Sequence, residues 1–308
     1  MKSLDVLFLV GVILLCGFIG GKLSSKLKFP SVVGFLVAGV FIGPSFCKLF
    51  NLQTLDSFGV FNDLALSLIA YIIGNEMPVS TIRKMGKGII TIIFSESIGA
   101  FILVALGVYL LTKKISLALI FGAMAPASAP AGTAIVLQEN KAKGPLTTSL
   151  YTVVGLDDGL AIMIYAFAIA FAKVSLVGGH ISFMHIIKGP VIEICGALAL
   201  GGISGIVCGF LLTKISKKED VLPFALAFIF MCTGISKYFH FSLILSNLIF
   251  GMVLASTYIS ENRKIINAIT FLITPIYILF FVIAGAHLQI KHLPSMGLIG
   301  LIYIVCRS

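Results

Sequence analysis

Long apolar runs separated by short polar connections occupy almost the whole chain. A helix needs about 20 predominantly apolar residues to cross a bilayer, and most of these runs have about that length. The pattern predicts eleven helical segments, with approximate limits 5–22, 31–50, 58–79, 86–112, 115–138, 145–174, 186–213, 220–239, 241–258, 265–288 and 294–308. We therefore expect an all-α polytopic membrane protein in which residues 1–308 form a single transmembrane domain.

The last predicted segment differs from the others in its length. It contains about 15 residues and reaches Ser308 with no loop after it. We expect this span to be incomplete and the sequence to be truncated within a helix.

Composition and charge agree with a membrane protein. Hydrophobic residues make up 59% of the chain and charged residues 11%, whereas a soluble domain carries about 25% charged residues. The net charge of +10 does not indicate nucleic-acid binding, because the basic residues are scattered over short loops. Loops after odd-numbered segments carry thirteen Lys and Arg residues, and the N-terminus and the other loops carry eight. By the positive-inside rule we expect the N-terminus to lie outside. We expect the protein to reside in the inner or plasma membrane of the cell.

Two adjacent carboxylates, Asp157 and Asp158, lie near the middle of segment 145–174. An ionised Asp at the centre of a membrane helix costs about 2.5–3.5 kcal/mol. The pair should therefore face protein or a water-filled cavity, which indicates an ion or proton pathway; an interhelical salt bridge is the alternative. Neighbours on a helix point about 100° apart, so the two side chains should meet different partners. Glu96 and Glu193 also lie in apolar segments, as relays or as structural hydrogen-bonding groups.

Segment 115–138 contains Pro126 and Pro130, followed by Gly132. Each proline removes an amide donor and costs about 3 kcal/mol in a helix interior. We expect the helix to break at mid-membrane, which is tolerated only where the backbone lines a cavity. The freed carbonyls, with the hydroxyls of Ser128 and Thr133, could then coordinate a cation. A simple proline kink is the alternative.

An internal repeat relates the second and third segments to the ninth and tenth. Gly39 and Gly74 lie 35 residues apart in the first copy, and Gly251 and Gly285 lie 34 residues apart in the second. The copies are seven helices apart, so they cross the membrane in opposite directions, as in the inverted repeats of secondary transporters. Chance similarity between Gly-containing apolar helices is the alternative.

Four stretches resemble the monovalent cation:proton antiporters, in particular the second cation:proton antiporter family of sodium/proton exchangers. They are Lys28–Ser45, Ile73–Glu76, Ala129–Ala131 and Gly155–Asp158. The resemblance covers essentially the whole chain and implies homodimers of thirteen-helix protomers with an inverted repeat and a broken fifth helix. A dimerisation panel and a mobile core would move against each other to give alternating access. The panel would comprise about 1–80 and 217–290, and the core about 86–174 and 293–308.

The resemblance also implies roles for single residues. Asp158 matches the carboxylate that carries the ion and the proton, and Asp157 matches its companion. In the family, a basic residue of the eleventh helix neutralises the crossing of the broken fifth and twelfth helices. The position of that residue falls near Arg307. The sequence departs from the family in lacking the last two helices, and in placing Arg307 where the electrogenic subgroup carries Lys. Because Arg stays protonated, the proton stoichiometry stays open.

These patterns together predict a secondary active transporter that exchanges a monovalent cation, with Na⁺ as the first choice, for protons. A K⁺/H⁺ exchanger, a K⁺ efflux system and a sodium-coupled organic-anion symporter are alternatives. An intramembrane aspartyl protease is a remote one, because no second Asp lies at that depth on another segment. With no P-loop and no Cys/His set at metal-binding spacing, we expect no cofactor, no metal other than the transported cation, and no enzymatic activity. The expected partners are a second copy of the chain and membrane lipid.

Overall fold

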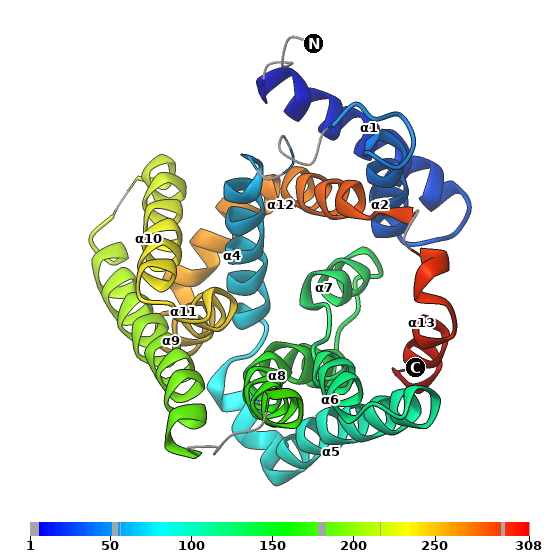
Figure 1. The fold of residues 1–308 in the computed structure, drawn as a ribbon. Helices are drawn as coiled ribbons and strands as arrows, with labels where there is room; N and C mark the ends of the chain where they lie inside the picture. The colour runs from blue at the N-terminus through cyan, green and yellow to red at the C-terminus, as the bar shows by residue number, and fades with distance from the viewer. Residues whose placement is uncertain are drawn as a thin grey trace.

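The computed structural model describes residues 6–50, 55, 57–177, 183–215, 217–290 and 293–307, and these residues form an all-helical fold (Figure 1). The helices are α1 (Val6–Lys26), α2 (Ser31–Ile42), α4 (Gly59–Asn75), α5 (Val79–Thr112), α6 (Ile115–Met124), α7 (Pro130–Glu139), α8 (Pro145–Val177), α9 (Phe183–Leu212), α10 (Lys218–Tyr238), α11 (Leu243–Thr257), α12 (Ile259–His287) and α13 (Leu293–Arg307). The N-terminal residue and Ser308, on which the expected orientation and the expected truncation depend, lie outside the described residues.

Every predicted segment contains a helix, but the prediction of eleven full spans is confirmed only in part. Among the described residues, six helices are long and apolar enough to cross a bilayer, namely α1, α5, α8, α9, α10 and α12. The segment predicted over 31–50 shows why some helices are shorter than the predicted segments. Its helix α2 ends at Ile42, because Pro44 offers no amide donor and disfavours helical backbone in Gly43, which is extended.

The repeated glycines lie at two helix crossings that are built alike. Gly39 and Gly285 lie where α2 crosses α12, and Gly74 and Gly251 lie where α4 crosses α11. A Cβ at each glycine would overlap the carbonyl oxygen of the residue three positions before the opposite glycine. For Gly39, Gly285, Gly74 and Gly251 these carbonyls belong to Val282, Leu36, Leu248 and Tyr71. Only glycine permits such close backbone contact between membrane helices, and the two copies use it at equivalent positions.

A third pair of glycines extends the correspondence. Gly86 kinks α5 with φ 62° and ψ −149°, and Gly297 kinks α13 with φ 47° and ψ −131°. This backbone region is readily adopted only by glycine. The separation between these two residues equals that between Gly74 and Gly285. Because α5 and α13 follow the two copies of the repeat, the repeat includes a further helix that the sequence comparison had missed.

The helices pack mainly within two groups, with α7 near the centre of the view in Figure 1. One group consists of α1, α2, α4 and α9–α12, and its largest cluster of buried side chains includes residues of α7. The other group consists of α5, α6, α8 and α13, in which α5, α6 and α13 share a separate apolar cluster. α7 contacts α2 and α4 in the first group and α8 in the second.

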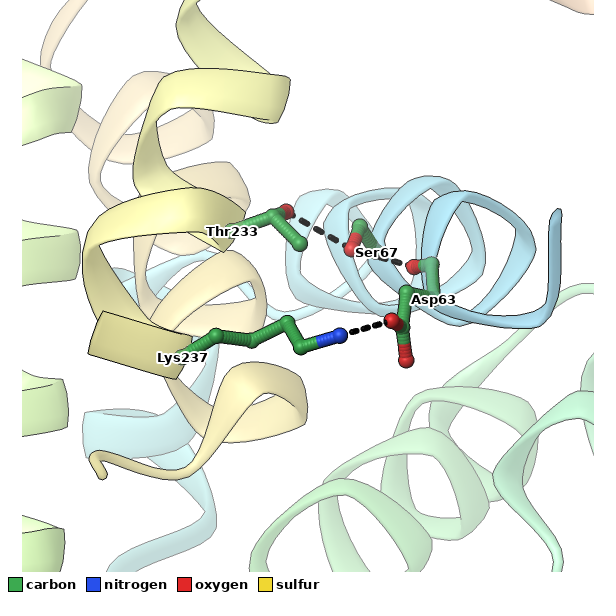
Figure 2. A network of polar contacts seen from close by, with 4 residues as sticks. All are labelled: Asp63, Ser67, Thr233 and Lys237. Carbon is green, nitrogen blue, oxygen red and sulfur yellow. Dashed lines mark hydrogen bonds and ion pairs between the residues drawn. The ribbon is translucent and has the colours of Figure 1, made fainter. Parts of the chain in front are cut away.

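A polar network fastens α4, α10 and α11 within the first group (Figure 2). Lys237 on α10 forms an ion pair with Asp63 on α4. The hydroxyl of Thr233 donates to Ser67 Oγ at 2.7 Å, and Ser67 donates to the carbonyl of Asp63 at 2.6 Å. The side-chain amide of Asn247, on α11, donates to Thr233 Oγ1 at 3.1 Å. Because Ser67, Thr233 and Asn247 are buried, these bonds hold the three helices in a defined arrangement.

Candidate functional site

The interrupted span lies at the inner side of the second group. α6 ends at Met124 and α7 begins at Pro130, so residues 125–129 separate two half-helices. The predicted break is confirmed, and a simple proline kink is excluded. Pro130 occupies the first turn of α7, where a missing amide hydrogen does no harm. Pro126 follows the end of α6 and cannot satisfy a helix carbonyl.

The two half-helices bring opposite partial charges to the interruption. A helix leaves its last four carbonyls and its first four amides without intrahelical partners. The end of α6 therefore offers carbonyl oxygens, of which Gly122 O accepts from the amide of Ala125. The start of α7 offers amides, and there Thr133 N donates to the carbonyl of Ala129 at 3.1 Å. Carbonyl oxygens and helix ends of this kind coordinate cations and stabilise anions in transporters.

Asp157 faces this interruption from α8. Its side chain is 1% exposed, and its polar and charged neighbours are Ser128, Asp158 and Glu96. Among the described residues, neither carboxylate oxygen of Asp157 nor the hydroxyl of Ser128 makes a hydrogen bond, although all three atoms are buried. Native proteins leave few buried polar atoms in this state, and a functional role is one of the reasons why such atoms persist. Three oxygen atoms facing one another suit a hard cation.

Asp158 faces a different direction, as the helical spacing predicted. It is half-buried and lines a cavity of about 570 Å³. Ala127 of the interruption, Tyr165 of α8 and Glu193 of α9 also line this cavity. One aspartate therefore lies in the protein interior against the interrupted helix, and its neighbour opens onto a cavity.

The opposite direction along α8 is closed by packing at Gly155. A Cβ at this glycine would lie 2.6 Å from Leu248 Cδ1 on α11 and 3.1 Å from Met77 Sδ. Both Leu248 and Met77 are fully buried. Gly159, four residues later on the same helix, has nothing within 4 Å of a Cβ among the described residues. Asp158 is thus open toward the C-terminal end of α8 and closed toward its N-terminal end.

Two other predicted site residues have less direct positions. Arg307 at the end of α13 lies with Nη2 3.5 Å from Oε1 of Glu96 on α5, and about a third of each side chain is exposed. Glu96 is also a charged neighbour of Asp157, so Glu96 has Arg307 and the aspartate as neighbours. Thr133 is half-buried in α7, and within the described part of the chain its hydroxyl makes no hydrogen bond to either aspartate.

Sequence reasoning did not predict that Glu193 lies in the same cavity as Asp158. It also gave no role to Leu248 and Met77. A carboxylate within an apolar segment was a visible signal for Glu193, but its position across the cavity depends on how α9 packs on α8. Leu248 and Met77 carry no signal in the sequence, because they look like any other apolar residue of a membrane helix.

Comparison with known proteins agrees with the geometry. The family model described as "Sodium/hydrogen exchanger, transmembrane" matches residues 10–307. The chain is 25% identical over 284 residues to the ammonium/H⁺ antiporter subunit AmhT of Alkalihalophilus pseudofirmus, which covers 89% of this chain and 69% of AmhT. Its fold is similar to that of the sodium proton antiporter MjNhaP1 from Methanocaldococcus jannaschii. One MjNhaP1 structure matches with a TM-score of 0.80 and 18% identity over 100% of this chain and 75% of that one. Another, at pH 8, matches with a TM-score of 0.76 and 17% identity over 98% and 76%.

The two structural matches establish the fold, and the family model adds the class of protein because it spans nearly the whole chain. The protein belongs to the sodium/hydrogen exchanger family, and is therefore an integral membrane cation/proton antiporter and not an enzyme.

Proposed function

We propose that the protein exchanges Na⁺ for protons by alternating access, and that Asp158 is the residue for which the two ions compete. The observation that carries this proposal is the position of Asp158, which opens onto a cavity at one side and is closed by helix packing at the other. A carboxylate that can hold either a proton or a cation couples their movements, since loading one expels the other.

Asp157 and Ser128 support the binding site from the interior. The buried oxygens of Asp157 and Ser128 are neighbours, and Asp157 also interacts with Asp158; the free carbonyls at the end of α6 can add further hard ligands. Thr133 belongs to the proposal as a ligand reached by a small rearrangement of α7. Arg307, paired with Glu96, would balance the negative charge of the aspartates.

Alternating access requires two bodies, and the packing supports the division into a panel and a core. The panel would comprise about residues 1–80 and 217–290, and the core about 86–174 and 293–308. Helices of each range pack mostly on one another, with α7 and α8 making most of the contacts between the ranges. On the closed side the two bodies meet where Gly155 packs on α11, and where Ser31 N donates to Oε2 of Glu139 at 3.2 Å.

The arrangement of the glycines supports an inverted repeat as the basis of this movement. The two crossings and the two kinks occupy equivalent positions in α2–α5 and α11–α13, and such repeats underlie alternating access in secondary transporters. We also propose a homodimer formed through the panel, in the inner or plasma membrane, with the N-terminus outside. In that orientation the cavity at Asp158 opens to the outside.

A second candidate cation follows from one relative. AmhT is named as a subunit of an ammonium/H⁺ antiporter, and oxygen ligands accept ammonium as well as alkali cations. K⁺ is a further candidate, as a K⁺/H⁺ exchanger or a K⁺ efflux system.

Proton flux in everted membrane vesicles tests the proposal, with Na⁺, Li⁺, K⁺ and ammonium supplied in turn. We expect Na⁺ to dissipate an imposed proton gradient. Asp158→Asn should abolish the response because an amide cannot exchange a proton for a cation, while the protein still inserts in the membrane. Asp157→Asn should weaken exchange without abolishing it. Proton-coupled flux at the wild-type rate in Asp158→Asn would refute the assignment.

A further inference from the structure

A second carboxylate faces the cavity that reaches Asp158. Glu193 lies about a third of the way along α9, and its side chain lines the same cavity as Asp158 on α8. An adjoining cavity of about 470 Å³ shares Ile162, Tyr165 and Glu193 with the first, and extends to His240 between α10 and α11. His240 is exposed. The two cavities therefore adjoin at Glu193, with Asp158 lining the first and His240 lining the second.

Among the described residues, Glu193 has no partner that would explain its presence in an apolar helix. It is half-buried and makes no hydrogen bond or ion pair within the part of the chain that the structure describes. Lys188, five residues earlier on α9, is exposed, and Lys237 pairs with Asp63. Ionisable residues inside membrane helices are costly, and they persist where they face a pathway for ions.

We propose that the two adjoining cavities form one passage for ions, and that Glu193 is a second cation-binding residue, which holds the transported monovalent cation there before it reaches Asp158. This inference rests on the proposed exchange at Asp158 and adds a binding step before it. A carboxylate in a cavity with low-dielectric walls concentrates cations there, because such walls focus the field. Asp158 would then draw its cation from a local concentration higher than that of the solution outside. Since Glu193 lies on one side of Asp158, it should assist loading from that side only.

The test compares Glu193→Gln, Glu193→Asp and the wild type in vesicles of both orientations, with Na⁺ as the probe. Glu193→Gln keeps the shape and removes the charge, so the apparent KM for Na⁺ supplied from the cavity side should rise about fivefold, the factor expected for one unit charge at about 4 Å even in water. The maximal rate and the KM from the other side should stay close to wild type. Glu193→Asp should restore the KM. Glu219→Gln, which removes a charge from an exposed position on α10, is the matched control and should change neither constant.

The salt dependence of the wild type is a second measurement that needs no variant. Added choline chloride screens the field of Glu193, so it should raise the KM for Na⁺ on the cavity side more than on the other side. An unchanged KM in Glu193→Gln, an equal rise from both sides, or a failure of Glu193→Asp to restore the KM would overturn the inference. Asp158→Asn is run in parallel. If it abolishes exchange while Glu193→Gln behaves as wild type, only the role of Glu193 fails; if exchange survives in it, the proposed function fails first.

Discussion

Gly155→Ala should open the closed side of the transporter. In the structure, a methyl group at this position would lie 2.6 Å from Leu248 Cδ1, 3.1 Å from Met77 Sδ and 3.5 Å from Ile73 Cγ2. All three neighbours are buried and have little room to withdraw. Overpacking of this kind costs about 1–3 kcal/mol. The cost applies only while α8 lies against α4 and α11, so the variant should favour the state in which they separate.

The size of the shift follows from the lower part of that range. A change of one or two kcal/mol multiplies an equilibrium constant by about 5–30. We therefore expect the population of the separated state to rise by about that factor if it is minor in the wild type. Thr152 lies on α8 one turn nearer the closed end and is fully buried. It is a suitable place for a cysteine that reports opening.

The assay measures the labelling rate of Thr152→Cys by a membrane-impermeant thiol reagent, added on the side where α8 begins, in a chain whose native cysteines have been replaced. Gly159→Ala is the matched control, because nothing lies within 4 Å of a Cβ there while the gain in helix propensity, about 1 kcal/mol, is the same. Labelling should accelerate about 5–30-fold in Gly155→Ala and stay near wild type in Gly159→Ala. Equal rates in the two variants would show that the contact at Gly155 does not hold this side closed.

Two further predictions concern the rigidity of the first group of helices and the repeat. Thr233→Val keeps the shape of the side chain but leaves Ser67 without its donor and Asn247 without its acceptor. The free energy of unfolding should therefore fall by about 1–3 kcal/mol. An unchanged Tm in detergent would show that the network does not contribute to stability. Gly39→Ala and Gly251→Ala each place a methyl group on an opposing backbone carbonyl. Both should lower the Tm by similar amounts, and a large effect in only one of them would contradict the equivalence of the two crossings.

What could be predicted from the sequence was local, or followed from helical geometry. Pro126 and Pro130 interrupt their helix through their own covalent structure, so the break between α6 and α7 was predictable without knowing any neighbour. The divergence of Asp157 and Asp158 followed from the rotation per residue. The structure adds which aspartate faces which surroundings, because that depends on how α8 is rotated against its neighbours.

The incorrect and missing parts depend on contacts between distant residues. Gly155 and Gly159 have the same side chain and lie on one helix, yet only Gly155 touches α11. The third element of the repeat, at Gly86 and Gly297, was hidden because the surrounding letters differ, whereas the backbone angles agree. A repeat preserved in backbone geometry more than in side chains has a physical cause, since a crossing or a kink needs only a missing Cβ. The side chains around such glycines were therefore free to diverge.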